Sequence, residues 1–210
     1  MHNEEGWRGG YNCKGGVCFQ LKPKPFNPYL LNSLMREFIY YSKTAPTSGG
    51  AIKDDLMKSG RIDIAIHTII AAFFLSHSFR DYVKLHLIFD GMPDPPRHLE
   101  LKPSTEGKTG EDKIYLSKKD ISWIIKRMLY KYKEGEKNEV FPGYWVEKKS
   151  LIQVIKELNE QGKEIYFLDE KGLDIRNIRI SDNPVFVVGD HMGLPRLKKE
   201  LKRIKVTNIS

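Results

Sequence analysis

Apolar residues recur with two different periods along residues 36–209, and the two periods alternate. Alternating or continuous apolar runs predict five strands, at 36–41, 83–89, 164–168, 185–188 and 206–209. Apolar residues spaced three and four apart predict helices at 63–78, 117–134 and 150–162, and a basic helix is expected at 194–203. Strands separated by helices are typical of an α/β fold with a largely parallel sheet.

Individual residues support these boundaries. Ser117 is placed to cap the helix that follows it, and Ser150 with Gln153 has the sequence of a capping box. Gly162 is placed to end the helix that starts at Ser150. The run 185–188 is apolar at every position, which is typical of a strand at the centre of a sheet covered on both faces.

The first 34 residues differ in composition from the rest of the chain. They are rich in glycine and proline and lack apolar periodicity, so we expect a flexible or turn-rich head. The character changes at Met35, where a second translation start would make the head upstream sequence. We therefore divide the chain into a head, 1–34, and a domain, 35–210. Within the domain, the polar stretch 91–113 is expected to contain a hairpin or short strands.

Both cysteines, Cys13 and Cys18, lie in the head. Their spacing could provide half of a zinc site, but zinc needs four ligands and His2 is the only histidine nearby. We therefore expect two exposed thiols and no metal site. Two cysteines in 210 residues also exclude a disulfide-rich scaffold and are typical of a reducing compartment.

The sequence predicts a cytoplasmic protein with no membrane partner. Its longest apolar run, 62–75, contains Asp63 and His67 and is shorter than the roughly 20 residues that a spanning helix needs. The N-terminus lacks the basic-then-apolar pattern of a signal peptide. We therefore interpret the run 62–75 as a buried helix.

The positive net charge of the chain suggests what kind of partner it binds. Lys and Arg number 35 against 27 Asp and Glu, so the formal charge is +8, which favours an anionic partner. The basic residues form two patches: Arg196, Lys198, Lys199, Lys202, Arg203 and Lys205, and Lys118, Lys119, Lys126, Arg127, Lys131 and Lys133. Such runs are usually a solvated helix face, and RNA binding is the alternative interpretation.

The strongest chemical signal is the polar loop Gly189–Leu194, which follows a buried strand. Ligands of open α/β sheets bind at the carboxyl ends of strands, and Gly189 would let the backbone approach a ligand closely. The loop matches neither the dinucleotide-binding nor the P-loop glycine pattern. A plain strand-to-helix turn is the alternative.

A second polar cluster surrounds the predicted buried helix. Arg61 and Asp63 flank its start, where an Asp is most often a cap, and His67 follows on the same helix face. Ser76 and His77 could form a nucleophile pair. However, neighbours in sequence seldom face each other on a helix, and no Asp is placed to complete a hydrolase triad.

Four segments carry a family resemblance, in this order: Met35–Phe38, Gly60–Asp63, Phe74–Arg80 and Gly189–Leu194. With them, residues 35–210 resemble the archaeal TrmY family of tRNA pseudouridine N1-methyltransferases, in the SPOUT superfamily. The chain is similar, more distantly, to the rRNA pseudouridine N1-methyltransferases of ribosome biogenesis. The head lies outside the resemblance.

The resemblance implies an α/β fold of the SPOUT type, with a parallel sheet, helices on both faces and a C-terminal trefoil knot. It implies a homodimer that binds S-adenosylmethionine in the knot loops, which Leu168, Gly189 and Ser210 match. The implied reaction is N1-methylation of pseudouridine-54 in the T-loop of tRNA.

The same resemblance suggests roles for the polar cluster. Asp63 is the candidate base or orienter for the N1 proton, and Arg61 is its candidate catalytic neighbour. Arg61, together with Arg80 and His77, is a candidate contact for substrate RNA.

The chain departs from the family at its C-terminal end. Family members continue beyond the position of Ser210 with the rest of the third loop and a helix that closes over the cofactor. We therefore expect the domain 35–210 to be C-terminally incomplete, which puts cofactor binding by this chain in question. A related rRNA enzyme and a non-catalytic basic RNA-binding protein are the alternatives.

Overall fold

The computed structural model describes residues 11–14, 17–20, 35–75, 78–102, 117–195, 197, 201 and 204–210. The chain divides into two compact units, Met1–Ser33 and Leu34–Ser210, which are described separately.

In the first unit, β1 (Tyr11–Lys14) and β2 (Val17–Gln20) form an antiparallel hairpin whose register places Cys13 opposite Cys18. The sequence predicts a flexible or turn-rich head and does not predict these two strands. Two consecutive glycines between the strands, a sequence typical of a tight hairpin turn, are the signal that was missed.

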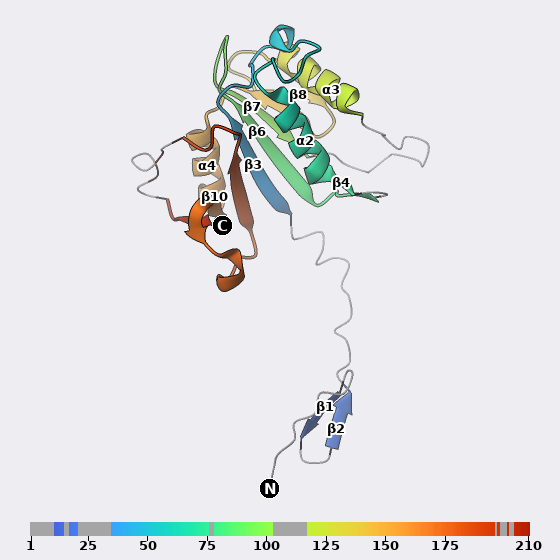
Figure 1. The fold of residues 1–210 in the computed structure, drawn as a ribbon, viewed down its shortest axis with the longest axis vertical. Helices are drawn as coiled ribbons and strands as arrows, with labels where there is room; N and C mark the ends of the chain where they lie inside the picture. The colour runs from blue at the N-terminus through green and yellow to red at the C-terminus, as the bar shows by residue number, and fades with distance from the viewer. Residues whose placement is uncertain are drawn as a thin grey trace. The chain divides into compact units, whose positions relative to one another are not determined.

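The second unit is built on one eight-stranded sheet with the order β12-β10-β11-β3-β6-β7-β9-β8 (Figure 1). The first five strands of this order run parallel. They are β12 (Val206–Ile209), β10 (Glu164–Leu173), β11 (Pro184–Gly189), β3 (Arg36–Ser42) and β6 (Val83–Phe89). These are the five strands that the apolar runs predict, so the predicted parallel core of the sheet is confirmed. β10 is five residues longer than predicted, and β3 and β11 are longer by one and two residues.

Three antiparallel strands extend the sheet beyond β6. They are β7 (Arg97–Leu101), β9 (Tyr144–Glu147) and β8 (Asn138–Phe141). β7 is a short strand in the stretch where the sequence predicts one. The hairpin of β8 and β9 was missed because Val146 is its only fully buried side chain among the described residues, so its apolar alternation is weak.

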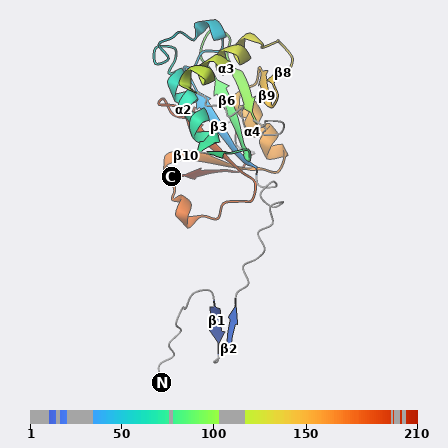
Figure 2. The same cartoon turned by 90° about the vertical axis from the view of Figure 1, so that its right-hand side faces the viewer.

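Helices cover both faces of the sheet, as expected for a SPOUT-type fold (Figures 1 and 2). Helices α2 (Ile62–Phe73) and α3 (Lys118–Tyr130) pack on one face, and α4 (Leu151–Glu160) packs on the other. Each face of the sheet has its own apolar core, and β3 contributes to both because its side chains alternate between the faces. Tyr40 faces α2, whereas Ile39 and Tyr41 face α4. None of the described helices is long and apolar enough to cross a membrane.

The predicted helix starts are confirmed at two capping boxes. Ser117 accepts a hydrogen bond from the backbone of Asp120, and Ser150 accepts one from the backbone of Gln153. The predicted end of α4 is also confirmed, since Gly162 has the positive φ of 78° that follows many helices.

Two helices end earlier than predicted. Helix α2 stops at Phe73 because the chain turns back as a short hairpin, β4 (Phe74–Leu75) and β5 (Ser78–Phe79). Arg80 then donates hydrogen bonds to the last carbonyls of the helix. Helix α3 ends at Tyr130, and the chain turns at Gly135 with a φ of 75°. Most of the predicted basic helix at 194–203 lies outside the described residues.

A buried polar cluster lies on the α4-facing side of the sheet, where β3, β6, β7 and β9 are neighbours. His86 Nδ1 is 2.9 Å from His98 Nε2, and His98 Nδ1 is 3.0 Å from a carboxylate oxygen of Glu147. At the other end, His86 Nε2 is 3.6 Å from Glu37 Oε2, which is longer than a hydrogen bond. The two histidines thus lie in a row between the carboxylates of Glu37 and Glu147, with three polar contacts along the row. Each contact needs one proton to form a hydrogen bond.

Two neutral histidines carry only two ring protons, so one of the three contacts must lack a hydrogen bond. The unmade contact is the one between Glu37 and His86, whose facing atoms have no hydrogen-bond partner among the described residues. Burial lowers the pKa of His98 to about 4, which keeps its ring neutral near pH 7. The long contact is therefore the expected state of a neutral pair.

Lysines neutralise the carboxylates of this cluster. Lys163 lies 2.6 Å from Glu37, and Lys84 and Lys137 lie 2.8 and 2.6 Å from Glu100. Burial alone would raise the pKa of Glu37, but the polar contact with His86, the hydrogen bond from Lys163 and the charges of Lys163 and Lys84 lower it to about 2. His86, His98 and Glu100 also bring potential metal-ligand atoms within 4.8 Å of one another, although the lysines already satisfy Glu100.

Candidate active site

The predicted loop after β11 is fastened to the loop after β3 by one carboxylate. Asp190 accepts hydrogen bonds from the Ser42 hydroxyl at 2.7 Å and from the Lys43 backbone at 3.1 Å. Its other oxygen accepts from the backbone of Met192 at 2.8 Å. Because Asp190 is 8% exposed and fully engaged, its role is to fix the two loops together at the carboxyl edge of the sheet.

Gly189 is needed for the shape of the same loop. The loop folds back so far that a Cβ at Gly189 would lie 2.5 Å from the carbonyl carbon of Gly193 and 2.8 Å from the nitrogen of Leu194. Asp190 and Gly193 also form an isolated antiparallel bridge. A larger residue at 189 therefore cannot be accommodated without moving backbone.

The three predicted cofactor positions lie on or directly after adjacent parallel strands. Leu168 is in the middle of β10 and does not end it as the sequence predicts, because the strand continues past a register shift to Leu173. Leu168 is in register with Ile209, the residue before Ser210, and β10 lies between β12 and β11, whose last residue is Gly189. Ser210 donates its backbone N–H to Leu173 at 2.8 Å and accepts from the backbone of Ile175 at 3.2 Å. The structure therefore brings Leu168, Gly189 and Ser210 to one edge of the sheet.

Exposed apolar side chains lie on the elements that form this edge. They are Leu168 and Leu173 in β10, Ile175 in the turn after it, and Met192 in the loop after β11. They lie beside loop backbone that offers peptide N–H and C=O groups. Apolar contacts to a base, combined with a few directional polar groups, are typical of cofactor sites. The residues present fit S-adenosylmethionine, with an apolar surface for the adenine and peptide groups for its polar edges.

Arg61 and Asp63 form a two-point ion pair at the start of α2. Arg61 Nε lies 3.0 Å from Asp63 Oδ1, and Nη2 lies 3.1 Å from Oδ2. Arg61 is the residue before the helix and has a left-handed backbone, with φ 58° and ψ 37°. Such a conformation in a non-glycine residue stores about 1–2 kcal/mol and is common at functional sites.

Hydrogen bonds from Arg61 lower the pKa of Asp63, and the charge of Arg61 adds to this effect. A carboxyl group whose pKa is lowered is ionised near pH 7 and is a weak base. The geometry therefore favours Asp63 as a hydrogen-bond acceptor that orients a substrate N–H, rather than as the group that takes the proton permanently.

The loop after β3 connects the two polar groups, because Lys43 donates its backbone N–H to Asp190 and Thr44 donates its hydroxyl to the carbonyl of Gly60, the residue before Arg61. The sequence did not single out Tyr40, which lies near the end of β3, before this loop. Its side chain is 2% exposed, and burial followed by the charge of Asp190 raises its pKa. A tyrosine in an apolar strand run is indistinguishable from a core residue in the sequence.

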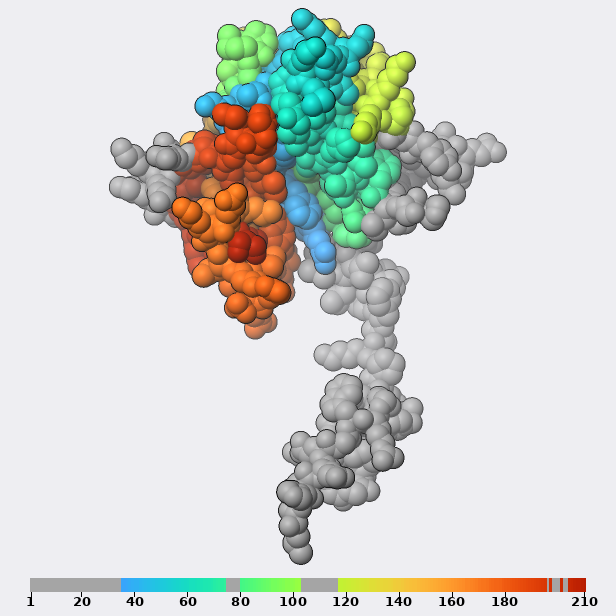
Figure 3. All heavy atoms as spheres, in the orientation of Figure 1, coloured from blue at the N-terminus to red at the C-terminus, as the bar shows by residue number. Residues whose placement is uncertain are grey.

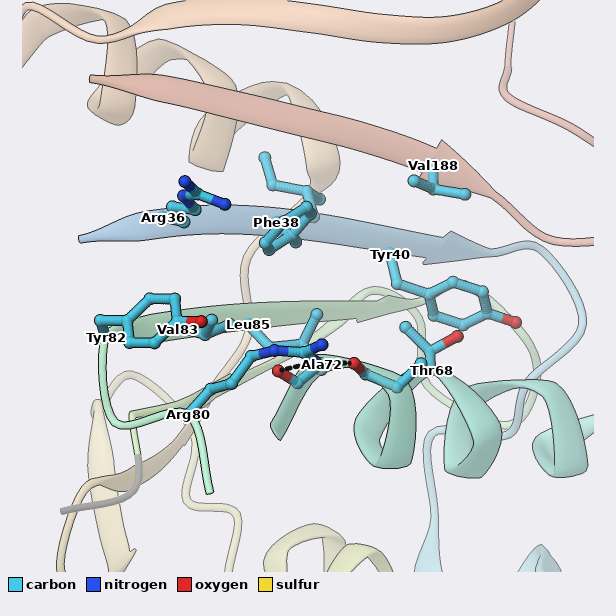
Figure 4. A pocket seen from close by; sticks show the side chains of 12 residues that line it. Arg36, Phe38, Tyr40, Thr68, Ala72, Arg80, Tyr82, Val83, Leu85 and Val188 are labelled. Atoms are coloured by element: carbon cyan, nitrogen blue, oxygen red, sulfur yellow. Dashed lines mark hydrogen bonds between the residues drawn. The ribbon is translucent and has the colours of Figure 1, made fainter. Parts of the chain in front are cut away.

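A pocket of about 360 Å³ lies between α2 and the sheet (Figure 4). Figure 4 shows Tyr40 and Thr68 toward one end and Arg36, Arg80 and Tyr82 toward the other. Its wall is mainly apolar, with Phe38, Leu85 and Val188 among the lining residues. It opens on the side of the sheet that α4 does not cover.

The remaining predicted RNA contacts are not brought together with Arg61. Arg80 lies beyond the opposite end of α2, where its guanidinium binds the carbonyls of Ala71 and Ala72. His77 lies outside the described residues. Within the described part of the chain, Arg61 and Asp63 are the predicted catalytic residues that lie in direct contact.

Comparison with known proteins shows the family of the chain. A family model described as "Putative SAM-dependent RNA methyltransferase" matches residues 35–210. A protein of Methanocaldococcus jannaschii named "tRNA (pseudouridine(54)-N(1))-methyltransferase" is 34% identical over 184 residues, which cover 84% of this chain and 87% of the relative.

A Pyrococcus abyssi protein of the same name is 35% identical, over 76% of this chain and 80% of the relative. A Photobacterium profundum protein named "Putative pseudouridine methyltransferase" is 28% identical, over 84% of this chain and 88% of the relative.

Proposed function

Because the chain belongs to the family described as "Putative SAM-dependent RNA methyltransferase", we propose that it methylates N1 of pseudouridine-54 in the T-loop of tRNA, using S-adenosylmethionine. The observation that carries this proposal is the similarity to tRNA (pseudouridine(54)-N(1))-methyltransferases, which covers three quarters or more of this chain. The site agrees with it, because an apolar nucleoside edge lies in the same region as a charged pair that can orient a base.

When bound, S-adenosylmethionine supplies an electrophilic methyl group on a sulfonium centre. Transfer forms an N1–CH₃ bond, breaks the S–CH₃ bond, and releases the N1 proton to solvent. We assign Asp63 to accept a hydrogen bond from the pseudouridine N1–H, which aligns N1 and draws electron density toward it. Arg61 holds Asp63 in this orientation through both guanidinium contacts and offers its remaining donors to RNA phosphate.

We assign Leu168, Gly189 and Ser210 to hold the cofactor. Arg80 and His77 remain candidate contacts for substrate RNA, since they follow α2 in the chain and Arg80 borders the pocket. The homodimer and the trefoil knot implied by the family resemblance remain predictions, as does the division between a head, 1–34, and the methyltransferase domain, 35–210. A tRNA substrate is consistent with the predicted cytoplasmic location.

Titration calorimetry with S-adenosylmethionine separates an enzyme from a non-catalytic RNA-binding protein. We expect saturable binding and competition by S-adenosylhomocysteine, the demethylated product. Absence of binding, both by this chain and by a chain extended beyond Ser210, would favour the non-catalytic alternative. Methylation of an rRNA fragment but not of tRNA would favour the related rRNA enzyme.

Replacing Gly189 with alanine is expected to weaken cofactor binding by about tenfold or more. The new Cβ would meet backbone atoms at 2.5–2.9 Å, so the loop must shift, at a cost of about 1–3 kcal/mol in the free energy of unfolding. Gly50→Ala is the matched control, because its Cβ would meet its nearest atom at 3.4 Å. Urea unfolding and calorimetry measure both effects, and equal cofactor affinity for the two variants would contradict the assignment.

A further inference from the structure

The outward face of α3 carries two large aromatic side chains that the fold leaves open. Trp123 is 53% exposed and Tyr130 is 66% exposed. They are seven residues apart, so they lie on one helix face about 10.5 Å apart along the axis. Arg127 lies between them, and its guanidinium carbon is 5.5 Å from the centre of the Trp123 ring. Exposed aromatic side chains in a row indicate a binding surface rather than ordinary solvated helix.

The same helix and the residues just after it are strongly basic. Four positive residues lie in α3 and two follow it, against the single negative residue Asp120: Lys118, Lys119, Lys126 and Arg127, then Lys131 and Lys133. Asp120 is engaged in the capping box with Ser117. In the described part of the chain, Lys126, Arg127 and Lys131 form no ion pair within 4 Å, so their charges are available to a partner.

Both aromatic rings are held on one side by the rest of the fold. Trp123 packs on Phe141 of β8, with ring centres 5.9 Å apart. Tyr130 packs against Gly49, where an added Cβ would lie 2.8 Å from the tyrosine ring carbons. The inward face of the helix anchors it in the core through Ile121, Ile125, Met128 and Leu129. The open ring faces are therefore presented by a rigid element, which reduces the entropy lost on binding.

This surface adjoins the candidate active site along the chain. Gly49, on which Tyr130 packs, belongs to the short helix η1 (Gly49–Ala51) in the segment that joins β3 to Arg61. Figure 3 shows α3, in yellow-green, at the surface beside this segment and α2, in cyan to teal. The segment that contacts Tyr130 through Gly49 therefore leads directly into Arg61 at the candidate active site.

We propose that the outward face of α3, defined by Trp123, Lys126, Arg127, Tyr130 and Lys131, is a docking surface for substrate RNA. Trp123 and Tyr130 stack on unpaired bases, and the three basic residues contact phosphates. This proposal rests on the proposed function and adds a site outside the reaction centre. RNA is favoured over a protein partner because uncompensated positive charge is interleaved with open aromatic faces, the combination that binds single-stranded nucleic acid.

Two double variants test the stacking directly. Trp123→Leu with Tyr130→Leu keeps apolar bulk but removes the rings, whereas Trp123→Phe with Tyr130→Phe keeps rings at both positions. Binding of a tRNA T-arm hairpin is measured at equilibrium by fluorescence anisotropy, without cofactor. We expect the leucine variant to bind at least tenfold more weakly and the phenylalanine variant to stay within about threefold of the original chain.

The charged residues are tested through salt. Replacing Lys126, Arg127 and Lys131 with glutamine should reduce the slope of log affinity against log salt concentration by about 2, since each phosphate contact contributes about 0.7. Circular dichroism checks the fold of every variant. Unchanged hairpin affinity in the leucine variant, or an unchanged salt slope in the glutamine variant, would overturn the proposal.

Cofactor affinity distinguishes this proposal from the proposed function. S-adenosylmethionine binding should be the same in all of these variants, because none of the changed residues lies at the carboxyl edge of β10, β11 and β12. A chain that binds the hairpin through α3 but neither binds nor uses the cofactor would keep the docking surface and defeat the enzyme assignment.

Discussion

Replacing Arg61 with glycine is expected to lower methyl transfer to tRNA by about 100-fold or more while leaving the fold intact. Glycine adopts the left-handed backbone of residue 61 without the strain that arginine stores there. That relief is partly offset by the greater freedom of glycine in the unfolded chain, so the free energy of unfolding should change by no more than about 1 kcal/mol. The side chain that holds Asp63 is nevertheless lost.

The expected loss of activity follows from the geometry of the pair. Without the two hydrogen bonds from Arg61, the Asp63 carboxylate is free to rotate, and misplacement of an orienting group by about 1 Å can cost 100-fold in rate. Asp63→Asn should cause a comparable loss, because an amide accepts the N1–H bond more weakly and carries no charge.

Single-turnover rates and urea unfolding, measured on the same protein preparations, test this expectation. Glu157→Gln is the control, since Glu157 is half exposed and pairs with Lys149 on the opposite side of the sheet. Activity of the Arg61→Gly variant within threefold of the original chain would show that the pair is structural only.

The second large effect is acid destabilisation by the buried polar cluster. Burial raises the pKa of Glu100 and Glu147, but hydrogen bonds from lysines to Glu100 and from His98 and Lys149 to Glu147 lower each to about 2. The pKa of Glu37 is also about 2, because burial is again outweighed by polar contacts, including the hydrogen bond from Lys163. A carboxylate with a lowered pKa stabilises the fold above its unfolded-state pKa, near 4.5, and this stability is lost as pH falls toward 2.

The histidines act in the same direction. His98 has a folded-state pKa of about 4 against an ordinary value of 6.5, so the unfolded chain binds its proton first as pH falls. The free energy of unfolding should therefore begin to fall below pH 6.5, where His98 contributes. It should fall more steeply below pH 4.5, where the three glutamates also contribute.

Glu37→Gln tests the origin of this pH dependence. The change leaves Lys163 without its buried carboxylate partner, which should cost about 3–5 kcal/mol at pH 7. It should also make unfolding less dependent on pH between 4.5 and 2.5. Urea unfolding at a series of pH values provides the measurement. A free energy of unfolding that stays constant from pH 7 to pH 3 in the original chain would contradict this assignment of the cluster.

The parallel part of the fold could be predicted because its signals are local. Each of its five strands is a single apolar run, and Ser150 with Gln153 marks a helix start within four residues. The position of the Gly189 loop at a strand end follows from the same reasoning. These features depend on residues that are close in sequence.

The rest depends on pairing between residues that are distant in sequence. His86 and His98 meet only because β6 and β7 are antiparallel neighbours, and Glu37 joins them only because β3 lies beside β6. The early end of α2 depends on Arg80, which returns to the helix only after a hairpin. Likewise, the basic residues of α3 could be found in the sequence, whereas the exposure of Trp123 and Tyr130 could not.

Methylation of defined tRNA tests the central claim most directly. Two transcripts that differ only in carrying pseudouridine or uridine at position 54 are incubated with the chain and methyl-labelled S-adenosylmethionine, and their nucleosides are identified by mass spectrometry. We predict 1-methylpseudouridine from the first transcript and no methylated nucleoside from the second, whose N1 carries the sugar. Equal methylation of both transcripts, or a methyl group on any atom other than N1 of pseudouridine, would contradict the proposed function.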